Sequence, residues 1–472
     1  MTQKKAIGFG FRGWMLILFQ AIAFLTYQVF TQYPLNILNE FYGGARLLGM
    51  IYTISAVVGI FIQLLLVKRV AKMKSVKLFS AILGCITLII ALGVATLHVG
   101  PLWYVAYALV NIFSVLYATF AIGIIVGQWF PTRKGTVMGI ATLTFPIANG
   151  MLGVFAGKVM PSVGAFLGMR AMAEMGSPEM AASAEMMMPY SAIFKGFLPF
   201  LIISVIGWLL GVIFIKDYPE QVGAFRDNNR DMTPEVATVM MEQEIENKKT
   251  TVWTPGHTLR CKEFWFAVIV NSLLLCCAIG LMSQSQAIIT PFEERLSRIG
   301  GYTGVMMMVM ISGMLGSYVL GLLDTRFGTR RAMAISGCLM IIAGVLGNIT
   351  GSAVALVLAM FFVALFMGAS SNFNVSFSAQ YWRREDFSSV FAMIAPLASL
   401  LGSIAPMVTA FVVFNKNNEY IGHARIFTIV GIAGVLCLIL MLIFKPSSIK
   451  AMDDKYRTEA GKPLDDALVG RK

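Results

Sequence analysis

Charged residues are scarce in this sequence: Asp, Glu, Lys and Arg together make up 13% of its 472 residues. Acidic residues are fewer than basic ones, 24 against 37. A soluble domain of ordinary composition carries about 25% charged residues. The shortage therefore argues against a soluble protein of this length.

Histidine and cysteine are also rare, with 3 and 6 residues. His98, His257 and His423 are scattered and show no metal-ligand spacing, so we expect no metal site and no cofactor. The cysteines fall in apolar segments or near the predicted cytoplasmic side, which leaves no extracellular disulfide framework.

Apolar residues, in contrast, make up 57% of the chain and gather into long runs. A helix needs roughly 20 mostly apolar residues to cross the hydrocarbon core of a membrane. Twelve segments meet this requirement: about 13–38, 46–67, 77–97, 101–127, 135–157, 195–215, 264–289, 302–323, 332–350, 353–380, 387–413 and 425–445.

The start of the chain, MTQKKAIGFGFR, is basic and precedes an apolar run, as in a signal peptide. The run is longer than the roughly 7–15 residues of a signal core, and no small-residue cleavage site follows it. We therefore expect the first transmembrane helix there.

The positive charges predict an orientation. If both termini face the cytoplasm, the cytoplasmic segments carry 29 of the 37 Lys and Arg residues and the outer segments carry 8. This asymmetry is what the positive-inside rule expects. The net charge of +13 is thus explained by topology, and no nucleic-acid partner is indicated.

The chain divides into two similar halves. QWFPTRKGTVMGIATLTFPIANG (128–150) aligns with QYWRREDFSSVFAMIAPLASLLG (380–402) when a two-residue indel is allowed. We expect a six-helix bundle at 1–215, a cytoplasmic central loop at 216–263, a second six-helix bundle at 264–446 and a cytoplasmic tail at 447–472. Two six-helix halves are the architecture of a secondary transporter that binds its solute near mid-membrane.

Residues 369–381 read ASSNFNVSFSAQY, with a polar residue at every second position. Alone, this alternation matches a half-buried β-strand. A lone strand cannot cross lipid, because its backbone groups would stay unpaired, so we expect a helix. On a helix Ser370, Asn374 and Ser378 share one face and Asn372 lies on another. One face is expected to line a polar cavity and the other to pack against neighbours.

GLLDTRFGTRR (321–331) resembles the cytoplasmic loop signature of the major facilitator superfamily, which lies between the second and third helices of a half. In that family an acid and an arginine cluster latch neighbouring helices. The resemblance implies a latch made by Asp324, Arg326, Gly328, Arg330 and Arg331.

WFPTRKG (129–135) and YPEQVGAFRDN (218–228) resemble the oxalate/formate antiporter and monocarboxylate porter branch of that family. The resemblance implies small organic acids as substrates. Transport of small dianions in that branch relies on basic residues inside the eighth and eleventh helices. The corresponding segments here, 304–323 and 390–406, contain no charged residue. A larger neutral or weakly charged organic compound therefore stays open as the alternative.

In such a fold the first, fourth, seventh and tenth helices line the pathway. Here they carry amides, hydroxyls and phenols, which orient a substrate without the penalty of a charge in the membrane. The same groups also join helices at interfaces, which is the competing interpretation for each of them. The candidates for substrate binding are Tyr27, Gln28, Gln32, Asn111, Tyr117, Gln284, Gln286, Ser371, Asn372 and Asn374.

Proton coupling usually needs a titratable group within the membrane, and no acid lies deep in the twelve segments. Glu40, Glu293 and Glu294 are expected at outer helix ends and Asp324 at an inner end. Exchange or facilitated diffusion is therefore at least as compatible with the sequence as proton symport. The expected partners are a small-molecule substrate, the lipid bilayer, and a coupling proton or counter-substrate.

The outer loop expected at 158–194 is rich in methionine, with Met169, Met172 and Met175 three apart. Thioethers are soft ligands that suit Cu(I), so Cu(I) transport is a hypothesis of a different class. Packing of flexible Met side chains over the pathway mouth is the alternative. A sensor that kept the carrier fold is a further alternative, although nothing in 216–263 resembles an output domain.

We therefore expect an all-α membrane protein with twelve transmembrane helices in two pseudo-symmetric six-helix bundles. It is expected to be a transporter and not an enzyme, and to move a small organic solute, with monocarboxylates as the first class, by alternating access. The expected location is a bacterial inner (cytoplasmic) membrane, with both termini in the cytoplasm.

Overall fold

The computed structural model describes residues 8–70, 73, 75–97, 100–130, 134–174, 188–228, 239, 251–462 and 464. Within these ranges the chain is helical almost throughout, and the only β feature is a single bridge between Phe414 and Tyr420. Helices dominate because lipid offers no hydrogen bonds, so each spanning segment must satisfy its own backbone groups.

Twelve described spans are long and apolar enough to cross a membrane, which confirms the twelve predicted segments. The first six consist of α1 (Gly10–Ile37), α2 (Ala45–Val70), α3 (Val76–Thr96), α4 (Gly100–Val115) continued by η1 (Leu116–Ala121) and α5 (Ile122–Trp129), α6 (Lys134–Thr142) with α7 (Thr144–Glu174), and α9 (Tyr190–Phe214). The last six consist of α12 (Lys262–Ser283) with α13 (Ser285–Ile289), α15 (Gly301–Phe327), α16 (Thr329–Gly347), α17 (Ala353–Tyr381), α18 (Arg384–Val413) and α19 (Ala424–Ile443).

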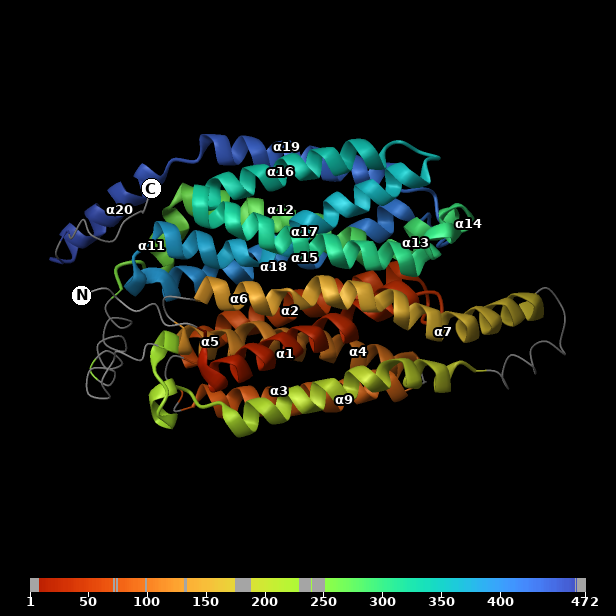
Figure 1. The fold of residues 1–472 in the computed structure, drawn as a ribbon, viewed down its shortest axis with the longest axis horizontal. Helices are drawn as coiled ribbons and strands as arrows, with labels where there is room; N and C mark the ends of the chain where they lie inside the picture. The colour runs from red at the N-terminus through yellow and green to blue at the C-terminus, as the bar shows by residue number, and fades with distance from the viewer. Residues whose placement is uncertain are drawn as a thin grey trace.

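Short helices connect or flank the spans. They are η2 (Pro219–Val222), η3 (Arg226–Asn228), α11 (Pro255–Arg260), η4 (Thr290–Phe292), α14 (Glu293–Leu296), η5 (Ser297–Ile299) and α20 (Pro446–Glu459). Figure 1 shows α1 to α9 on one side of the bundle and α12 to α19 on the other. We call the end of the bundle where α1 begins and α19 ends the terminal end, and the opposite end the distal end.

The polar run at 369–381 is helical, as expected, because it forms the last part of α17. Four features differ from the expected simple spans. The fourth span contains a π-helical turn, η1, and the seventh is broken at Gln284. The loop expected from residue 158 is helical up to Glu174, because α7 continues past the other helices at the distal end (Figure 1). The tail forms α20.

The two groups of helices pack tightly where small residues allow their backbones to approach. A Cβ at Gly313 of α15 would come within 2.6 Å of Pro146 Cβ on α7, and one at Gly153 of α7 would come within 2.9 Å of Thr303 Cα. Gly150 of the same helix faces Met310, whereas a Cβ at Gly157 would meet nothing within 4 Å.

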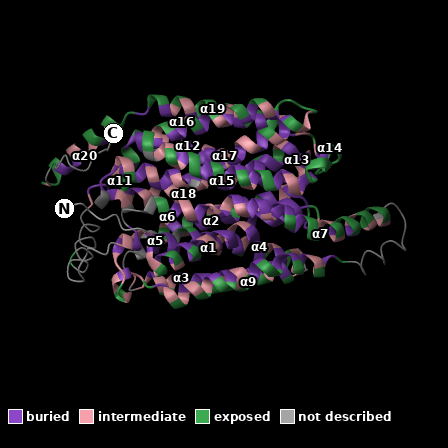
Figure 2. Ribbon diagram, viewed as in Figure 1, coloured by how far each residue is buried: buried purple, intermediate pink, exposed green. Residues whose placement is uncertain are grey.

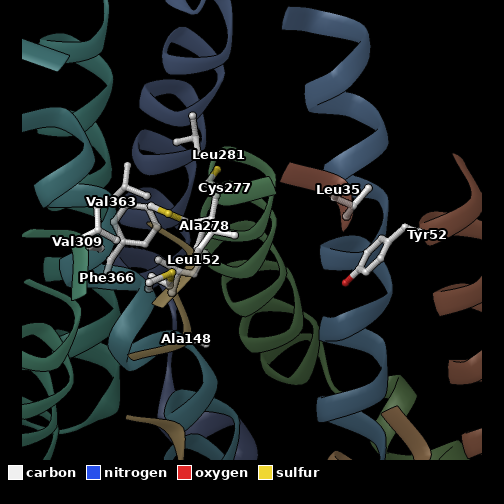
Figure 3. Close-up of a cluster of buried hydrophobic side chains, with 14 of the residues drawn as sticks. Leu35, Tyr52, Ala148, Leu152, Cys277, Ala278, Leu281, Val309, Val363 and Phe366 are labelled. Atoms are coloured by element: carbon white, nitrogen blue, oxygen red, sulfur yellow. The ribbon is translucent and has the colours of Figure 1, made fainter. Parts of the chain in front are cut away.

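Apolar side chains from both groups share one large core cluster, and a second cluster lies mainly within the first group. Figure 3 shows Leu152 of α7 beside Val309 of α15 and Phe366 of α17, and all three are fully buried. Large apolar side chains such as Leu65 and Ile432 are instead exposed on the outside of the bundle, where Figure 2 shows exposed positions on the outer helices. An apolar outer face is what contact with lipid requires.

A buried cluster of ion pairs fixes α20 to the terminal end. The Arg383 and Arg457 Nε atoms lie 2.8 Å and 3.0 Å from Asp453 Oδ2, and Arg457 Nη2 lies 2.6 Å from Asp386 Oδ2. All four side chains are at most 5% exposed. Trp253 donates its indole N–H to Asp453 Oδ1 at 2.9 Å.

This cluster joins three segments that are distant in the sequence: the end of the central loop, the turn between α17 and α18, and the tail. Ser389 of α18 donates a hydrogen bond to the Trp253 carbonyl at 2.6 Å. The His257 ring stacks on the ring of Tyr456 of α20, with centroids 3.9 Å apart. Buried charges are tolerated only when they are paired and hydrogen-bonded. The docked position of α20 therefore depends on these pairs.

We predict that Asp453→Asn releases α20, because breaking a buried ion pair costs about 3–5 kcal/mol. Trypsin cleavage at Lys450 and Lys455 of the purified protein should become at least about 100-fold faster, since local opening exposes these sites. The neighbouring Asp454, whose side chain makes no described polar contact, gives the matched control Asp454→Asn. Equal cleavage rates in the two variants would contradict the prediction.

Candidate functional site

A polar contact between the two groups of helices lies at the distal end, where α1 meets the junction of α12 and α13. Gln284 separates these helices and has φ −125° and ψ 18°. In an unbroken helix the Gln286 N–H would bond the Met282 carbonyl. Here the side chain of Asn36 replaces that bond: Nδ2 donates to Met282 O, and Oδ1 accepts from Gln286 N at 3.2 Å.

The contact is reinforced by a hydroxyl. Ser285 Oγ donates to Asn36 Oδ1 at 3.1 Å and lies 3.1 Å from the Tyr302 hydroxyl of α15. Asn36 itself is 4% exposed. A side chain inserted into the backbone ladder is a recognised cause of helix breaks. Asn36 of one half thus satisfies the broken backbone of the other.

Two side-chain amides beside this contact have unused hydrogen-bonding capacity. Gln284 is 1% exposed, and neither its Oε1 nor its Nε2 has a partner among the described residues. Gln32, one turn before Asn36 on α1, is 5% exposed and its Oε1 is likewise unpaired. A buried amide left unpaired costs about 1–3 kcal/mol. These atoms are therefore available to a solute.

The candidates on α17 are used in two different ways. Asn374 accepts a hydrogen bond from Asn271 Nδ2 of α12 at 2.6 Å and lies inside the second half. Asn372 accepts one from Thr142 Oγ1 of α6 at 2.8 Å, so this candidate contacts the first half. The side chain of Ser371 lies outside the described residues.

The other candidates lie in different surroundings. Tyr27 and Tyr52 place their hydroxyls 3.1 Å apart, and Gln28 is half-buried. Asn111 donates to its own helix at Tyr107 O and keeps an unpaired Oδ1.

Two candidates contribute little to a shared polar surface. The ring of Tyr117 packs against Phe19, with centroids 5.9 Å apart, and faces Gly84 of α3, within its own half. Gln286 takes part in the distal contact through its backbone N–H. We therefore leave Tyr117 out of the proposed solute site.

One buried carboxylate was not identified from the sequence. Glu263, in the first turn of α12, is 1% exposed and lies 3.9 Å from Lys262 Nζ. The sequence placed it at the end of the central loop, where an acid is normally solvated. Its position directly before the apolar run was the only available signal.

The residues of the predicted latch bond to partners other than one another. Asp324 accepts a hydrogen bond from Thr329 Oγ1 at 2.6 Å, and Arg330 donates to the carbonyls of Met441 and Leu442 at 2.7 and 2.8 Å, at the end of α19. Gly328 has φ +87°, which glycine adopts readily. Arg326 and Arg331 are exposed.

A Cβ added at Gly328 would come within 2.8 Å of Gln380 Nε2 on α17. The Thr329 N–H donates to Gln380 Oε1 at 2.8 Å. The signature therefore joins α15 and α16 to α17 and α19. The joining groups are a hydroxyl, an amide and backbone carbonyls in place of an acid-to-arginine pair.

The methionine-rich region is described only in part. Met169 is half-buried and Met172 is exposed, and both lie on the distal extension of α7. Met175 and the methionines that follow it up to residue 187 lie outside the described residues. The Cu(I) hypothesis remains a prediction.

Two small cavities lie away from this site. One, bordered by Phe19, Lys77 and Trp208 within the first half, has a volume of about 10 Å³, which is room for about one water molecule. The other lies beside Trp253 and Asp453 at the terminal end. Gln32 and Gln284, which are 5% and 1% exposed, are covered by protein in this arrangement.

Comparison with known proteins gives one family and several similar folds. The family model described as Major Facilitator Superfamily matches residues 14–406. A structure of the nucleoside transporter NupG shares 14% identity with a TM-score of 0.58, covering 93% of this chain and 99% of that one. A structure of the proton:xylose symporter XylE shares 13% identity with a TM-score of 0.60, covering 93% of this chain and 98% of that one. A structure of the peptide transporter POT shares 13% identity with a TM-score of 0.58, covering 94% of this chain and 96% of that one. The comparison with curated proteins gives no match.

We predict that Asn36→Ala opens the distal end, because it removes the hydrogen bonds that join α1 to the α12–α13 junction. Ser283, fully buried next to Gln284, provides a reporter as Ser283→Cys. Its labelling by a membrane-impermeant maleimide should become about 10- to 100-fold faster, which corresponds to about 1–3 kcal/mol of lost contact.

Asn39→Ala is the matched control, because among the described residues Asn39 Nδ2 bonds only Leu35 O and Asn36 O, within its own helix end. It should leave the labelling rate nearly unchanged. If both variants label at the same rate, Asn36 does not hold the distal end closed.

We predict that Arg330→Gln lowers stability by about 1.5–3 kcal/mol, because charged hydrogen bonds to two carbonyls at the end of α19 are lost. Arg331→Gln, at the adjacent exposed position, is the control and should be nearly neutral. Thermal unfolding of the two purified variants in detergent measures the difference. A larger loss in Arg331→Gln would show that the latch is assigned to the wrong arginine.

Proposed function

The chain belongs to the major facilitator superfamily, and on that basis we propose that it carries a small organic monocarboxylate across a bacterial inner membrane by alternating access. As an integral membrane protein of this family it transports small solutes. The observation that carries the proposal is the pair of buried amides, Gln32 and Gln284, with unpaired atoms where the two halves meet.

Their position fits a solute site. They lie on α1 and at the end of α12, two of the helices expected to line the pathway, and Asn36 links these helices beside them. In transporters built from repeats the solute binds between the halves, often at a broken helix. The break at Gln284 is of this kind.

Transport would proceed by rocking of the halves. The close packing of α7 against α15, through Gly153 and Gly313, keeps the halves together while they tilt. Opening the distal end requires loss of the Asn36 hydrogen bonds. Closing the terminal end requires α6 and α17 to stay together, and the bond between Thr142 and Asn372 contributes to this.

We place the terminal end in the cytoplasm. The support is the distribution of Lys and Arg, because 29 of the 37 fall in segments that the sequence assigns to the cytoplasm, and the described parts of those segments lie at that end (Figure 1). The central loop, the latch and α20 would then all lie on the cytoplasmic side.

A neutral polar solute is the second candidate class. The four pathway helices carry no Lys, Arg, Asp or Glu between residues 13–39, 100–129, 264–292 and 353–381. A site without a fixed charge suits an uncharged solute, because no partner charge is needed. Sugars, nucleosides and small amides represent this class.

The test is uptake by purified protein in liposomes of a labelled panel, from formate to aromatic acids, together with neutral polyols and nucleosides. We predict saturable uptake of monocarboxylates that is stimulated by the same solute inside, since a solute-bound carrier exchanges. Protein-free liposomes correct for passive entry.

Uptake of neutral solutes alone would replace the carboxylate assignment by the second class. No uptake of any organic solute, combined with uptake of Cu(I), would transfer the function to the methionine-rich region.

A further inference from the structure

The amide of Gln284 presents a donor and an acceptor side by side in a buried setting. Its Nε2 and Oε1 are both without a partner among the described residues, and the side chain is 99% buried. Gln32 adds a second acceptor, its Oε1. Since nearly all buried polar groups in proteins are paired, this set of atoms points to a ligand that supplies both a donor and an acceptor.

The backbone around Gln284 holds this amide in place. Asn36 bonds Met282 on one side of it and Ser285 and Gln286 on the other. Asn36 lies one turn from Gln32 on α1. Gln32 is thus on the same helix as the side chain that bonds the backbone on both sides of Gln284.

A carboxyl group complements this site in one protonation state only. A neutral carboxylic acid has an O–H donor beside a C=O acceptor, which matches the acceptor and donor of a primary amide. An ionised carboxylate offers acceptors only and would face two amide oxygens. It would also be a charge in a buried site without a cation, which is strongly unfavourable.

The titratable and charged groups around the site do not supply that cation. Tyr302 of α15 lies next to Ser285, and Tyr52 of α2 pairs with Tyr27. Glu293 accepts from the Tyr302 N–H at 3.0 Å, and Arg46 of α2 is used on the Phe414 carbonyl at 2.7 Å. These groups are thus phenols, an acid that accepts a backbone N–H, and an arginine that bonds the Phe414 carbonyl and lies over the Phe411 ring.

We propose that Gln284, assisted by Gln32, binds the substrate carboxyl group in its protonated form, so that the proton crosses the membrane on the solute. This proposal rests on the monocarboxylate function above and adds its coupling. No acidic residue of the pathway helices is then needed to carry the proton. Low dielectric raises the pKa of a carboxyl group, which helps the bound acid to stay neutral.

The test is binding to the detergent-purified protein as a function of pH, measured by calorimetry with lactate and with lactamide. For lactate the apparent affinity should fall about tenfold for each pH unit above the pKa of the acid, because only the protonated fraction binds. Lactamide, an isostere with the same donor and acceptor but no titration, should bind equally at every pH.

Three variants locate the effect. Gln284→Met keeps the size of the side chain and should weaken both ligands at least tenfold. Thr290→Val, an exposed change on the same segment, should leave both affinities unchanged. Glu263→Gln removes the buried carboxylate at the other end of α12 and should leave the pH profile of lactate unchanged.

The outcomes separate this proposal from the proposed function. If lactate is bound and transported, and its affinity does not depend on pH, the monocarboxylate function is supported but binding of the protonated form is overturned. A pH profile lost in Glu263→Gln shows that the protein carries the proton, which also overturns it. Failure of every acid to bind or to be transported rejects the proposed function itself.

Discussion

The absence of water from the hydrocarbon core is the constraint on which this structure depends. Each backbone N–H and C=O within the membrane must find a protein partner, so the spans are helical, including the alternating segment 369–381. Where the backbone departs from a regular helix, a partner has to come from elsewhere. At the break in the seventh span that partner is the amide of Asn36.

That single side chain couples local structure to the arrangement of the halves. Because Asn36 belongs to α1 and repairs the ladder between Met282 and Gln286, the break and the closed distal end are one feature. The same break leaves Gln284 with an unpaired buried amide. A broken helix, a contact between halves and an available hydrogen-bonding group therefore occur together, as expected where a solute is bound and released.

Charge is placed according to the same constraint. The pathway helices contain none in their apolar spans, while paired charges gather at the terminal end, where Arg383, Asp386, Asp453 and Arg457 form a buried cluster. There the ion pairs organise the tail and the end of the central loop. Recognition inside the membrane is left to amides and hydroxyls, which are less costly to bury than charges.

The sequence by itself determined the twelve spans, the helical state of 369–381 and the family, because hydrophobic length and the loop signature are properties of contiguous residues. It also identified Gln32 and Gln284 as candidates. It did not indicate the role of Asn36, the buried state of Glu263 or the docking of α20 through Asp453, and it grouped Tyr117 with the pathway. These features depend on which distant segments face each other, and only tertiary packing decides whether a polar group is paired, solvated or left available.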